Sequence, residues 1–269
     1  MKLQGKTIWI TGASSGVGEG MAKVFHREGA EVILSARRQQ ELERVQAACT
    51  GGPRPAHVVA FDGTDPQARE RAAQSVLARF PRIDVLVNNA GIGQRSALLD
   101  TKPEVERRIM EVDYFAPVAL TRLVLPRMIE QGGGHLVVTS SVAGKHAVPH
   151  HSSYCAAKHA LHGYFDTLRV EHLDDRIDVT MLVIAGIKSH VFRHALTGDG
   201  SEYGASNWDN STGISAEACA ERVVDEGLVG RGYELIIGIE PALQAMQIRQ
   251  TDPALFVQRM AGMLKWLKR

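Results

Sequence analysis

Short apolar runs alternate with helical stretches along almost the whole chain, and this alternation is the strongest constraint on its fold. Strands separated by helices of ten or more residues imply crossover connections and a parallel sheet covered by helices on both faces. The chain is therefore predicted to be α/β, a doubly wound seven-stranded parallel sheet flanked by helices. The predicted strands are Thr7–Ile10, Glu31–Leu34, His57–Phe61, Ile83–Val87, His135–Thr139, Val179–Ile184 and Leu235–Gly238. Helices are predicted from about Gly16, then at Arg38–Ala48, Ala68–Phe80, Pro103–Met128 with a break near Asp113–Pro117, Ser152–Leu173, Ser215–Leu228 and Pro241–Arg269.

Charge and cysteine content exclude some function classes. Lysine plus arginine number 31 and aspartate plus glutamate 30, a net charge of +1 that argues against a dedicated nucleic-acid binder. The three cysteines form no CxxC pair, so neither a disulfide framework nor a zinc site is predicted. The N-terminus lacks a signal-peptide core, and no apolar stretch could span a bilayer. We therefore expect a cytoplasmic protein without a membrane span.

No repeat, linker or shift in composition marks a domain boundary, so residues 1–269 are predicted to form one domain. Within it, about 189–229 is predicted to be a substrate loop and helix region, and 241–269 a C-terminal helical segment. Ligands of doubly wound sheets bind beyond the carboxyl ends of the strands, where the strand order reverses. The residues that directly follow each strand are therefore the candidates for a functional site.

A glycine-rich loop follows the first predicted strand and opens the first helix. Gly12 can form the tight turn, Gly16 allows the backbone to approach a pyrophosphate, and Gly18 allows the helix to pack closely on the sheet. The start of the helix offers unpaired N–H groups and the positive end of its dipole to phosphates. Because the strand–loop–helix context is present, a dinucleotide site of Rossmann type is favoured over an ordinary turn.

Tyr154 and Lys158 open the long predicted helix Ser152–Leu173. Residues four apart share a helix face, so the lysine charge is expected to favour the tyrosinate and lower the phenol pKa from about 10. Proton transfer near neutral pH benefits from such a phenol. The pair alone is weak evidence, because tyrosine and lysine are common on helix faces.

Three motifs together resemble the short-chain dehydrogenase/reductase family, of the compact single-domain type. They are TGxxxGxG at 11–18, NNAG at 88–91, and YxxxK at 154–158 with Ser141 thirteen positions before the tyrosine. The resemblance covers most of residues 4–190 and thins beyond Ser189. It implies that Tyr154 is the general acid in carbonyl reduction and the base in alcohol oxidation. It also implies that Lys158 binds the nicotinamide ribose and that Ser141 binds the substrate oxygen.

The resemblance also implies a set of cofactor contacts. Ala36 stands where relatives that prefer NAD carry aspartate, and the Arg37 that follows suits a 2′-phosphate, so NADP(H) is expected in preference to NAD(H). The alternative is that Arg37 and Arg38 are only a solvated helix start. Asp62 matches the residue that contacts adenine, and its alternative role is in a turn or helix cap before Pro66. The predicted cofactor residues are Gly12, Ser14, Ser15, Gly16, Val17, Gly18, Arg37, Arg38, Asp62, Asn89, Ala90, Gly91, Tyr154, Lys158 and Ile187.

Two departures from the family pattern stand out. Asp113 occupies the position of the asparagine that in the family helps to hold a water linked to the lysine, and an ionised aspartate donates no hydrogen bond. It could support that water or place negative charge beside Lys158. After the sixth strand, Ala185 replaces the usual proline, so Ser189 is a loose match for the family threonine and Ile187 is expected to contact the carboxamide through its backbone.

Other features have weaker readings. Five histidines between His146 and His162 lack the spacing of a metal site, so no metal is predicted, and His150 and His151 lie near the expected substrate entrance. Tyr203 and Trp208 could cover an apolar ligand as part of a lid. The C-terminal residues around Trp266 form a basic amphipathic segment, either an oligomer contact, a membrane-surface helix or an ordinary packed helix.

The sequence therefore predicts NADP(H)-dependent interconversion of a ketone or aldehyde and the corresponding alcohol. The resemblance implies a homodimer or homotetramer built on the two long helices and the last strand. The alternatives are an NADP(H)-binding regulatory protein with little or no turnover, motivated by Asp113, and epimerisation or dehydration on the same scaffold. The substrate beyond a small carbonyl or alcohol, the direction and the stereochemistry are not readable from the residues.

Overall fold

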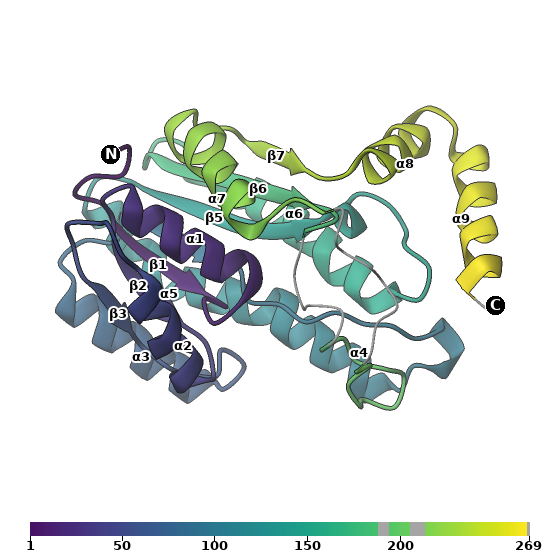
Figure 1. Cartoon of the computed structure of the whole chain (residues 1–269), viewed down its shortest axis with the longest axis horizontal. Helices are drawn as coiled ribbons and strands as arrows, with labels where there is room; N and C mark the ends of the chain where they lie inside the picture. The colour runs from purple at the N-terminus through teal and green to yellow at the C-terminus, as the bar shows by residue number, and fades with distance from the viewer. Residues whose placement is uncertain (188–193, 205–212, 268–269) are drawn as a thin grey trace.

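A computed structural model of the chain describes residues 1–187, 194–204 and 213–267. Within these residues, seven parallel strands form one sheet in the order β3-β2-β1-β4-β5-β6-β7, with helices on both faces (Figure 1). The predicted fold class is confirmed. The strands are β1 Thr7–Thr11, β2 Glu31–Ser35, β3 Ala56–Val58, β4 Val85–Asn88, β5 Gly134–Ser141, β6 Ile177–Ile184 and β7 Glu234–Ile237.

The helices follow the predicted alternation. They are α1 Gly16–Arg27, α2 Gln39–Ala48, α3 Pro66–Arg79, α4 Pro103–Met110, α5 Ala116–Glu130, α6 Ser152–Glu171, α7 Ala216–Arg222, α8 Glu240–Thr251 and α9 Pro253–Leu267. None of the helices in the described part of the chain has the length and hydropathy needed to cross a bilayer.

The irregularity predicted near Asp113–Pro117 is present between α4 and α5, but it is not a break in the helix. A π-helical turn, Glu111–Phe115, joins the two helices without interrupting them. Pro117 has no N–H to donate to the α-helical hydrogen-bond pattern, and the wider π-helical turn lies directly before it. The predicted C-terminal helical segment, 241–269, contains two helices, α8 and α9, separated at Asp252 just before Pro253.

The third strand is shorter than predicted, with three residues in regular pairing. The backbone beyond it still follows β2, because Val59 N–H donates to the Leu34 carbonyl and Phe61 N–H donates to the Ala36 carbonyl. The prediction for 57–61 therefore located the segment correctly and overestimated its regularity.

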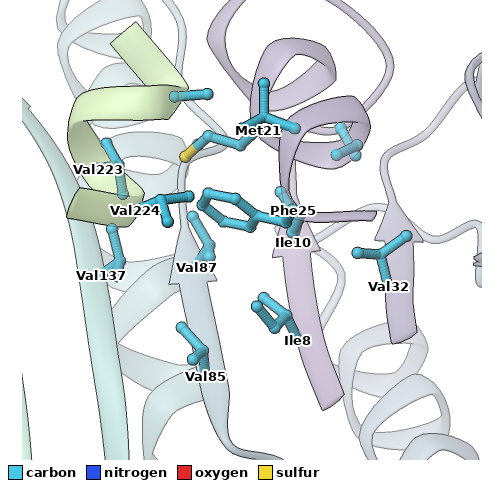
Figure 2. Packing of buried hydrophobic residues seen from close by; sticks show 14 of the residues in the cluster. Ile8, Ile10, Met21, Phe25, Val32, Val85, Val87, Val137, Val223 and Val224 are labelled. Atoms are coloured by element: carbon cyan, nitrogen blue, oxygen red, sulfur yellow. The ribbon is translucent and has the colours of Figure 1, made fainter. Parts of the chain in front are cut away.

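Successive residues of the central strands enter opposite cores, as a sheet buried on both faces requires. Ile8 and Ile10 of β1 belong to the core under α1, whereas Trp9 between them belongs to the core under α3, α5 and α6. Figure 2 shows the first core, where Phe25 of α1 lies over Ile10 and Val87. This double burial fixes the register of β1 and hence the position of the loop that follows it.

The chain reverses its direction of strand addition between β1 and β4. β1 pairs with β2 on one side and with β4 on the other, although β4 lies more than 70 residues further along the chain. In doubly wound sheets, the connections from the carboxyl ends of two such strands depart in opposite directions and leave a crevice outside those ends. The glycine loop and the NNAG segment border this crevice.

Candidate active site

The glycine loop at the end of β1 can be formed only by glycine at two of its positions. Gly12 has a φ of +66°, and a Cβ there would lie 2.8 Å from the Ala90 Cα. A Cβ on Gly18 would lie 2.2 Å from the Gly12 carbonyl oxygen, so α1 packs directly against the loop. Both observations agree with the tight turn and the close packing predicted from sequence. Gly16 also has a positive φ, +57°, and its closeness to a pyrophosphate stays a prediction.

The first turn of α1 faces the crevice as a potential anion site. Ser15 caps the helix without a side-chain hydrogen bond to it, and the first N–H groups of any helix lack partners within the helix. Two arginines approach the loop from α2. Arg38 donates to the Ser14 hydroxyl at 3.4 Å, and Arg44 donates to the Ser14 carbonyl at 3.2 Å while pairing with Glu19 at 2.8 Å. The loop is therefore held by two arginines, one of which is neutralised by Glu19.

A threonine that sequence reasoning did not single out joins the two sides of the crevice. The Thr11 hydroxyl donates to the Val87 carbonyl at 3.1 Å and accepts from the N–H groups of Asn89 and Ala90 at 3.0 and 3.2 Å. The Asn89 amide donates to the Thr11 carbonyl and its oxygen accepts from the Thr139 hydroxyl. Asn89 thus ties β1, β4 and β5 together. The sequence signal for this role was the threonine of TGxxxGxG, whose side-chain hydroxyl makes the bonds, whereas the glycines of the motif act through the backbone.

The residues after β2 and β3 form the outer end of the crevice. Arg37 and Arg38 are exposed, directly beyond β2. The Asp62 carboxylate accepts from the Thr64 N–H at 2.9 Å and from its hydroxyl at 2.7 Å. Burial raises the pKa of Asp62, but these hydrogen bonds outweigh burial, so the net pKa is lowered. The cap of α3 is Asp65 rather than Asp62, because Asp65 accepts from the first N–H groups of that helix.

Ser141, Tyr154 and Lys158 converge, as the spacing predicted. Ser141 ends β5, and its hydroxyl accepts from the Ala143 N–H at 3.2 Å and opposes the rise in the pKa of the Tyr154 phenol. Tyr154 and Lys158 come from the first two turns of α6, with the lysine Nζ 5.5 Å from the centroid of the tyrosine ring. The Lys158 ammonium is buried and donates to the Thr139 carbonyl at 3.1 Å.

Asp113 is the fourth member of this cluster. Its side chain is fully buried in the π-helical turn, with Oδ2 3.2 Å from the Lys158 Nζ and Oδ1 accepting the Ile92 N–H at 2.8 Å. Of the two roles considered for Asp113, the geometry fits negative charge beside Lys158: burial raises the pKa of Asp113, and the Lys158 ammonium and the Ile92 N–H oppose that rise. A Cβ on Gly91 would lie 3.3 Å from the Asp113 Oδ2 and 3.4 Å from the Lys158 Nζ, so a glycine gives this ion pair its space.

The ion pair changes the electrostatics expected from Tyr154 and Lys158 alone. Burial raises the pKa of Tyr154, Lys158 opposes this effect, and the Asp113 carboxylate adds to it. The net pKa of the phenol is raised, so the lowering predicted from the i, i+4 lysine is present but outweighed. Burial lowers the pKa of Lys158, but Asp113 and Tyr154 reverse that effect and hold the ammonium charged.

Gln94 is a buried residue of the site that sequence reasoning missed. Its Oε1 accepts the N–H groups of Ser153 and Tyr154 at 2.9 and 3.2 Å, while His151, the N-cap of α6, makes no side-chain cap bond. Its Nε2 donates to three hydroxyls, those of Ser96, Thr101 and Ser152. Gln94 therefore caps the helix that carries Tyr154 from a loop 60 residues away. No local pattern signals a cap of this kind.

The substrate side of the crevice is only partly described. Ile187 is buried and bridges to Ile214, and its contact with a carboxamide stays a prediction. Tyr203 lies under the Arg95 guanidinium, 4.9 Å from ring centroid to Cζ, beside the predicted entrance. Ser189 and Trp208 lie outside the described residues. Over the described part of the chain, no three His, Cys, Asp or Glu side chains converge as metal ligands.

Comparison with known proteins places this arrangement in a family. The model of the short chain dehydrogenase family matches residues 6–199, which include the glycine loop, NNAG and the Ser–Tyr–Lys cluster. The chain belongs to the short-chain dehydrogenase family. A dehydrogenase/reductase SDR family member 7B of Xenopus laevis is 40% identical over 98% of this chain and 83% of its own length. A Drosophila melanogaster family protein 7-like is 38% identical over 97% and 81%.

Solved structures of short-chain dehydrogenases share the fold. One from Streptomyces avermitilis superposes with a TM-score of 0.79 at 28% identity, covering 97% of this chain and 99% of that one. A metagenomic short-chain oxidoreductase in complex with NADP gives 0.73 at 28%, covering 88% and 98%. This short-chain dehydrogenase is accordingly an oxidoreductase, and its substrate and cofactor preference are matters for proposal.

Proposed function

We propose that the protein is an NADP(H)-dependent oxidoreductase that interconverts a ketone or aldehyde and the corresponding alcohol. One observation carries the proposal: Ser141, Tyr154 and Lys158 converge at the carboxyl edge of the sheet, in the same crevice as the glycine loop. When bound, the nicotinamide supplies or accepts the hydride. The protein must therefore bind both molecules, orient them and move one proton.

The residues present fit a dinucleotide. The Gly12 backbone meets Ala90 where any Cβ would intrude, and α1 presents its first N–H groups and positive dipole end to the same crevice. Under this proposal the loop Gly12–Gly18, with Ser14, Ser15 and Val17, holds the pyrophosphate. Asp62, Asn89, Ala90 and Gly91 line the adenosine and ribose side, and the backbone of Ile187 meets the carboxamide.

Preference for NADP(H) rests on the charge beyond β2. Arg37 is exposed at the position that follows the strand, and guanidinium groups pair with phosphate through a fork of donors. Neither Ala36 nor any residue directly after β2 supplies the carboxylate that would hold a ribose 2′-hydroxyl. A structural relative of this chain was solved in complex with NADP, which supports the same preference.

Tyr154 is proposed to transfer the proton. In reduction its phenol O–H donates to the carbonyl oxygen, and in oxidation its phenolate accepts the alcohol proton. Ser141, whose hydroxyl favours the phenolate form of Tyr154, is proposed to donate to the same substrate oxygen and to stabilise the charge that develops there. Lys158, buried and held charged, is proposed to bind the nicotinamide ribose.

NADPH consumption over a panel of small ketones and aldehydes tests the proposal, with Tyr154→Phe measured in parallel. We expect turnover by the native protein and a loss of about 10²- to 10⁴-fold in the variant, because the proton donor is removed while the fold is kept. NADPH binding, followed by the change in its fluorescence, should be nearly the same in both proteins. Equal turnover in both would contradict the assignment of Tyr154.

A second candidate is an NADP(H)-binding regulatory protein with little or no turnover. The observation that favours it is the Asp113 carboxylate, 3.2 Å from Lys158, which cancels the charge that assists the tyrosine. NADPH binding without turnover over the whole panel would favour this reading. Turnover that depends on Tyr154 would exclude it.

Assembly and location complete the proposal. A homodimer or homotetramer built on α5 and α6 is supported by an open apolar groove of about 690 Å³ between these helices, lined by Leu125, Ile129 and Leu168. The short strand β7 at the sheet edge offers a second contact. A cytoplasmic location and small-molecule partners, without nucleic acid, are proposed from the near-neutral charge and the cysteine pattern.

A further inference from the structure

The buried carboxylate of Asp113 is the feature that most separates this site from the family pattern. It lies in the π-helical turn Glu111–Phe115, and its side chain is fully buried. One oxygen is held by the Ile92 N–H, and the other has the Lys158 ammonium at 3.2 Å and no hydrogen-bond donor with good geometry. A buried carboxylate is costly unless a charge of opposite sign lies beside it. The buried charges of Asp113 and Lys158 therefore each depend on the presence of the other.

We propose that Asp113 is a positioning residue that makes Lys158 one half of a neutral ion pair, keeps the Tyr154 phenol protonated, and thereby adapts the site to carbonyl reduction. The inference rests on the proposed oxidoreductase function and deepens it, since it assigns the direction for which the proton-transfer group is prepared. Asparagine at this position would accept the Ile92 N–H equally well but would leave the lysine charge uncompensated.

The charges around Tyr154 decide the sign of the effect. On α6 they are the Lys158 ammonium and the Cys155 thiol, with the His151 ring at the N-cap 6.3 Å from the Tyr154 ring between centroids, and on the π-helical turn the Asp113 carboxylate. From β5, Ser141 contributes a hydroxyl and Thr139 a carbonyl that accepts from Lys158. α4 contributes the Glu106 carboxylate, which accepts from the Ser153 hydroxyl at 3.4 Å.

Burial favours the phenol most strongly, and Asp113 and Cys155 add to that effect, whereas Lys158 and Ser141 favour the phenolate. A lysine alone would present a full positive charge to the tyrosine. With Asp113 in contact, the tyrosine faces a dipole of zero net charge, whose influence falls off much faster with distance. Removal of the carboxylate should therefore lower the pKa of Tyr154.

Each direction of the reaction needs a different form of Tyr154. Reduction needs the phenol and is lost as the pH rises through the pKa of Tyr154. Oxidation needs the phenolate and appears as the pH rises through the same pKa. A raised pKa keeps the reductive form populated over the whole neutral range and delays oxidation to alkaline pH. Asp113→Asn should shift both limbs of the pH profile to lower pH.

The experiment compares Asp113→Asn with Glu111→Gln in the full-length protein. Both substitutions change a carboxylate to an amide on the same turn, but only Asp113 forms the ion pair with Lys158. The first readout needs no turnover: the ultraviolet absorbance of tyrosinate is titrated in each protein, and the Tyr154 signal is isolated by subtraction of the same variant carrying Tyr154→Phe. The second readout is the pH profile of NADPH oxidation and NADP⁺ reduction.

We expect the Tyr154 midpoint of the native protein to lie above the ordinary value of about 10. In Asp113→Asn it should fall by at least about one pH unit, with a rise of about tenfold in oxidation rate at neutral pH. In Glu111→Gln neither quantity should change. An unmoved or raised midpoint in Asp113→Asn would overturn the proposal. If that variant does not fold, a native midpoint well below 10 would overturn it instead, and one above 10 would support it.

The two readouts also separate this inference from the proposed function. A shifted midpoint without turnover in any protein would support the role of Asp113 and contradict the oxidoreductase assignment. Turnover that requires Tyr154, with pH profiles that do not change in Asp113→Asn, would support the oxidoreductase assignment and contradict the role of Asp113.

Discussion

The two sides of the crevice are built by different means. On the β1 side, the shape of the loop depends on Gly12 and Gly18, where the backbone of one segment touches the backbone of the next. On the β5 and α6 side, the shape depends on buried polar side chains, above all Gln94 and the Asp113–Lys158 pair. The first side is therefore sensitive to an added methyl group, and the second to a lost hydrogen bond or charge.

This difference has a functional reason. A phosphate chain is bound by backbone N–H groups, which any residue can supply once the backbone has the right path. Proton transfer needs a particular side chain with a particular protonation state, so its surroundings must be made of side chains as well. Substitutions on the β1 side should therefore change the affinity for the cofactor, and substitutions on the β5 and α6 side should change the rate of turnover.

Gly12→Ala should produce the largest effect on the cofactor side. We expect NADPH affinity to fall at least about 100-fold, because the new Cβ would sit 2.8 Å from the Ala90 Cα and a positive φ costs a non-glycine residue about 1–2 kcal/mol. Titration of NADPH fluorescence measures it. Gly5→Ala is the matched control, since Gly5 has a φ of +79° with nothing within 4 Å of a Cβ. Similar affinities in the two variants would show that steric contact is not what the glycine avoids.

Arg37→Ala should have the next largest effect. A charge-assisted hydrogen bond contributes about 1.5–3 kcal/mol, so NADPH affinity should fall about 10- to 100-fold while NADH affinity stays the same. The comparison of the two cofactors in one protein is the internal control. A parallel loss for both would mean that Arg37 supports the loop rather than a 2′-phosphate.

Gln94→Leu should act on the other side and more mildly. It leaves the N–H groups of Ser153 and Tyr154 unpaired, which should cost about 1–3 kcal/mol of stability, and the displaced helix start should lower kcat about tenfold with NADPH affinity unchanged. Thermal unfolding and steady-state kinetics measure the two effects.

Gln131→Leu provides the matched control for that experiment. The Gln131 amide also bonds to backbone, at Ile83 and Gly133, but these residues precede β4 and β5, at the opposite ends of the strands from the site. It should lose stability and keep kcat. An equal loss of kcat in both variants would show that the Gln94 effect is general destabilisation.

The same contrast explains what the sequence could predict. The fold and the glycine loop were readable because alternation, spacing and glycine are local signals with a backbone cause. The convergence of Ser141, Tyr154 and Lys158 followed from family resemblance and from i, i+4 geometry. The bonds of Gln94 and the net pKa of Tyr154 were not readable, because each depends on groups brought from distant segments. The irregularity near Asp113–Pro117 was readable in position but not as a π-helical turn, since Pro117 signals a local disruption and not its kind.

The hydroxyl of Thr11 has a consequence for the thermodynamics of the whole sheet. It forms hydrogen bonds to the backbone of Val87, Asn89 and Ala90, so the proposed cofactor site forms only when β1 and β4 are paired. A ligand that binds this pocket therefore cannot stabilise one half of the sheet without the other. Saturation with cofactor at 100 times its dissociation constant adds about 2.7 kcal/mol to the stability of the native state. That increment should raise the melting transition of all seven strands together, as one cooperative event.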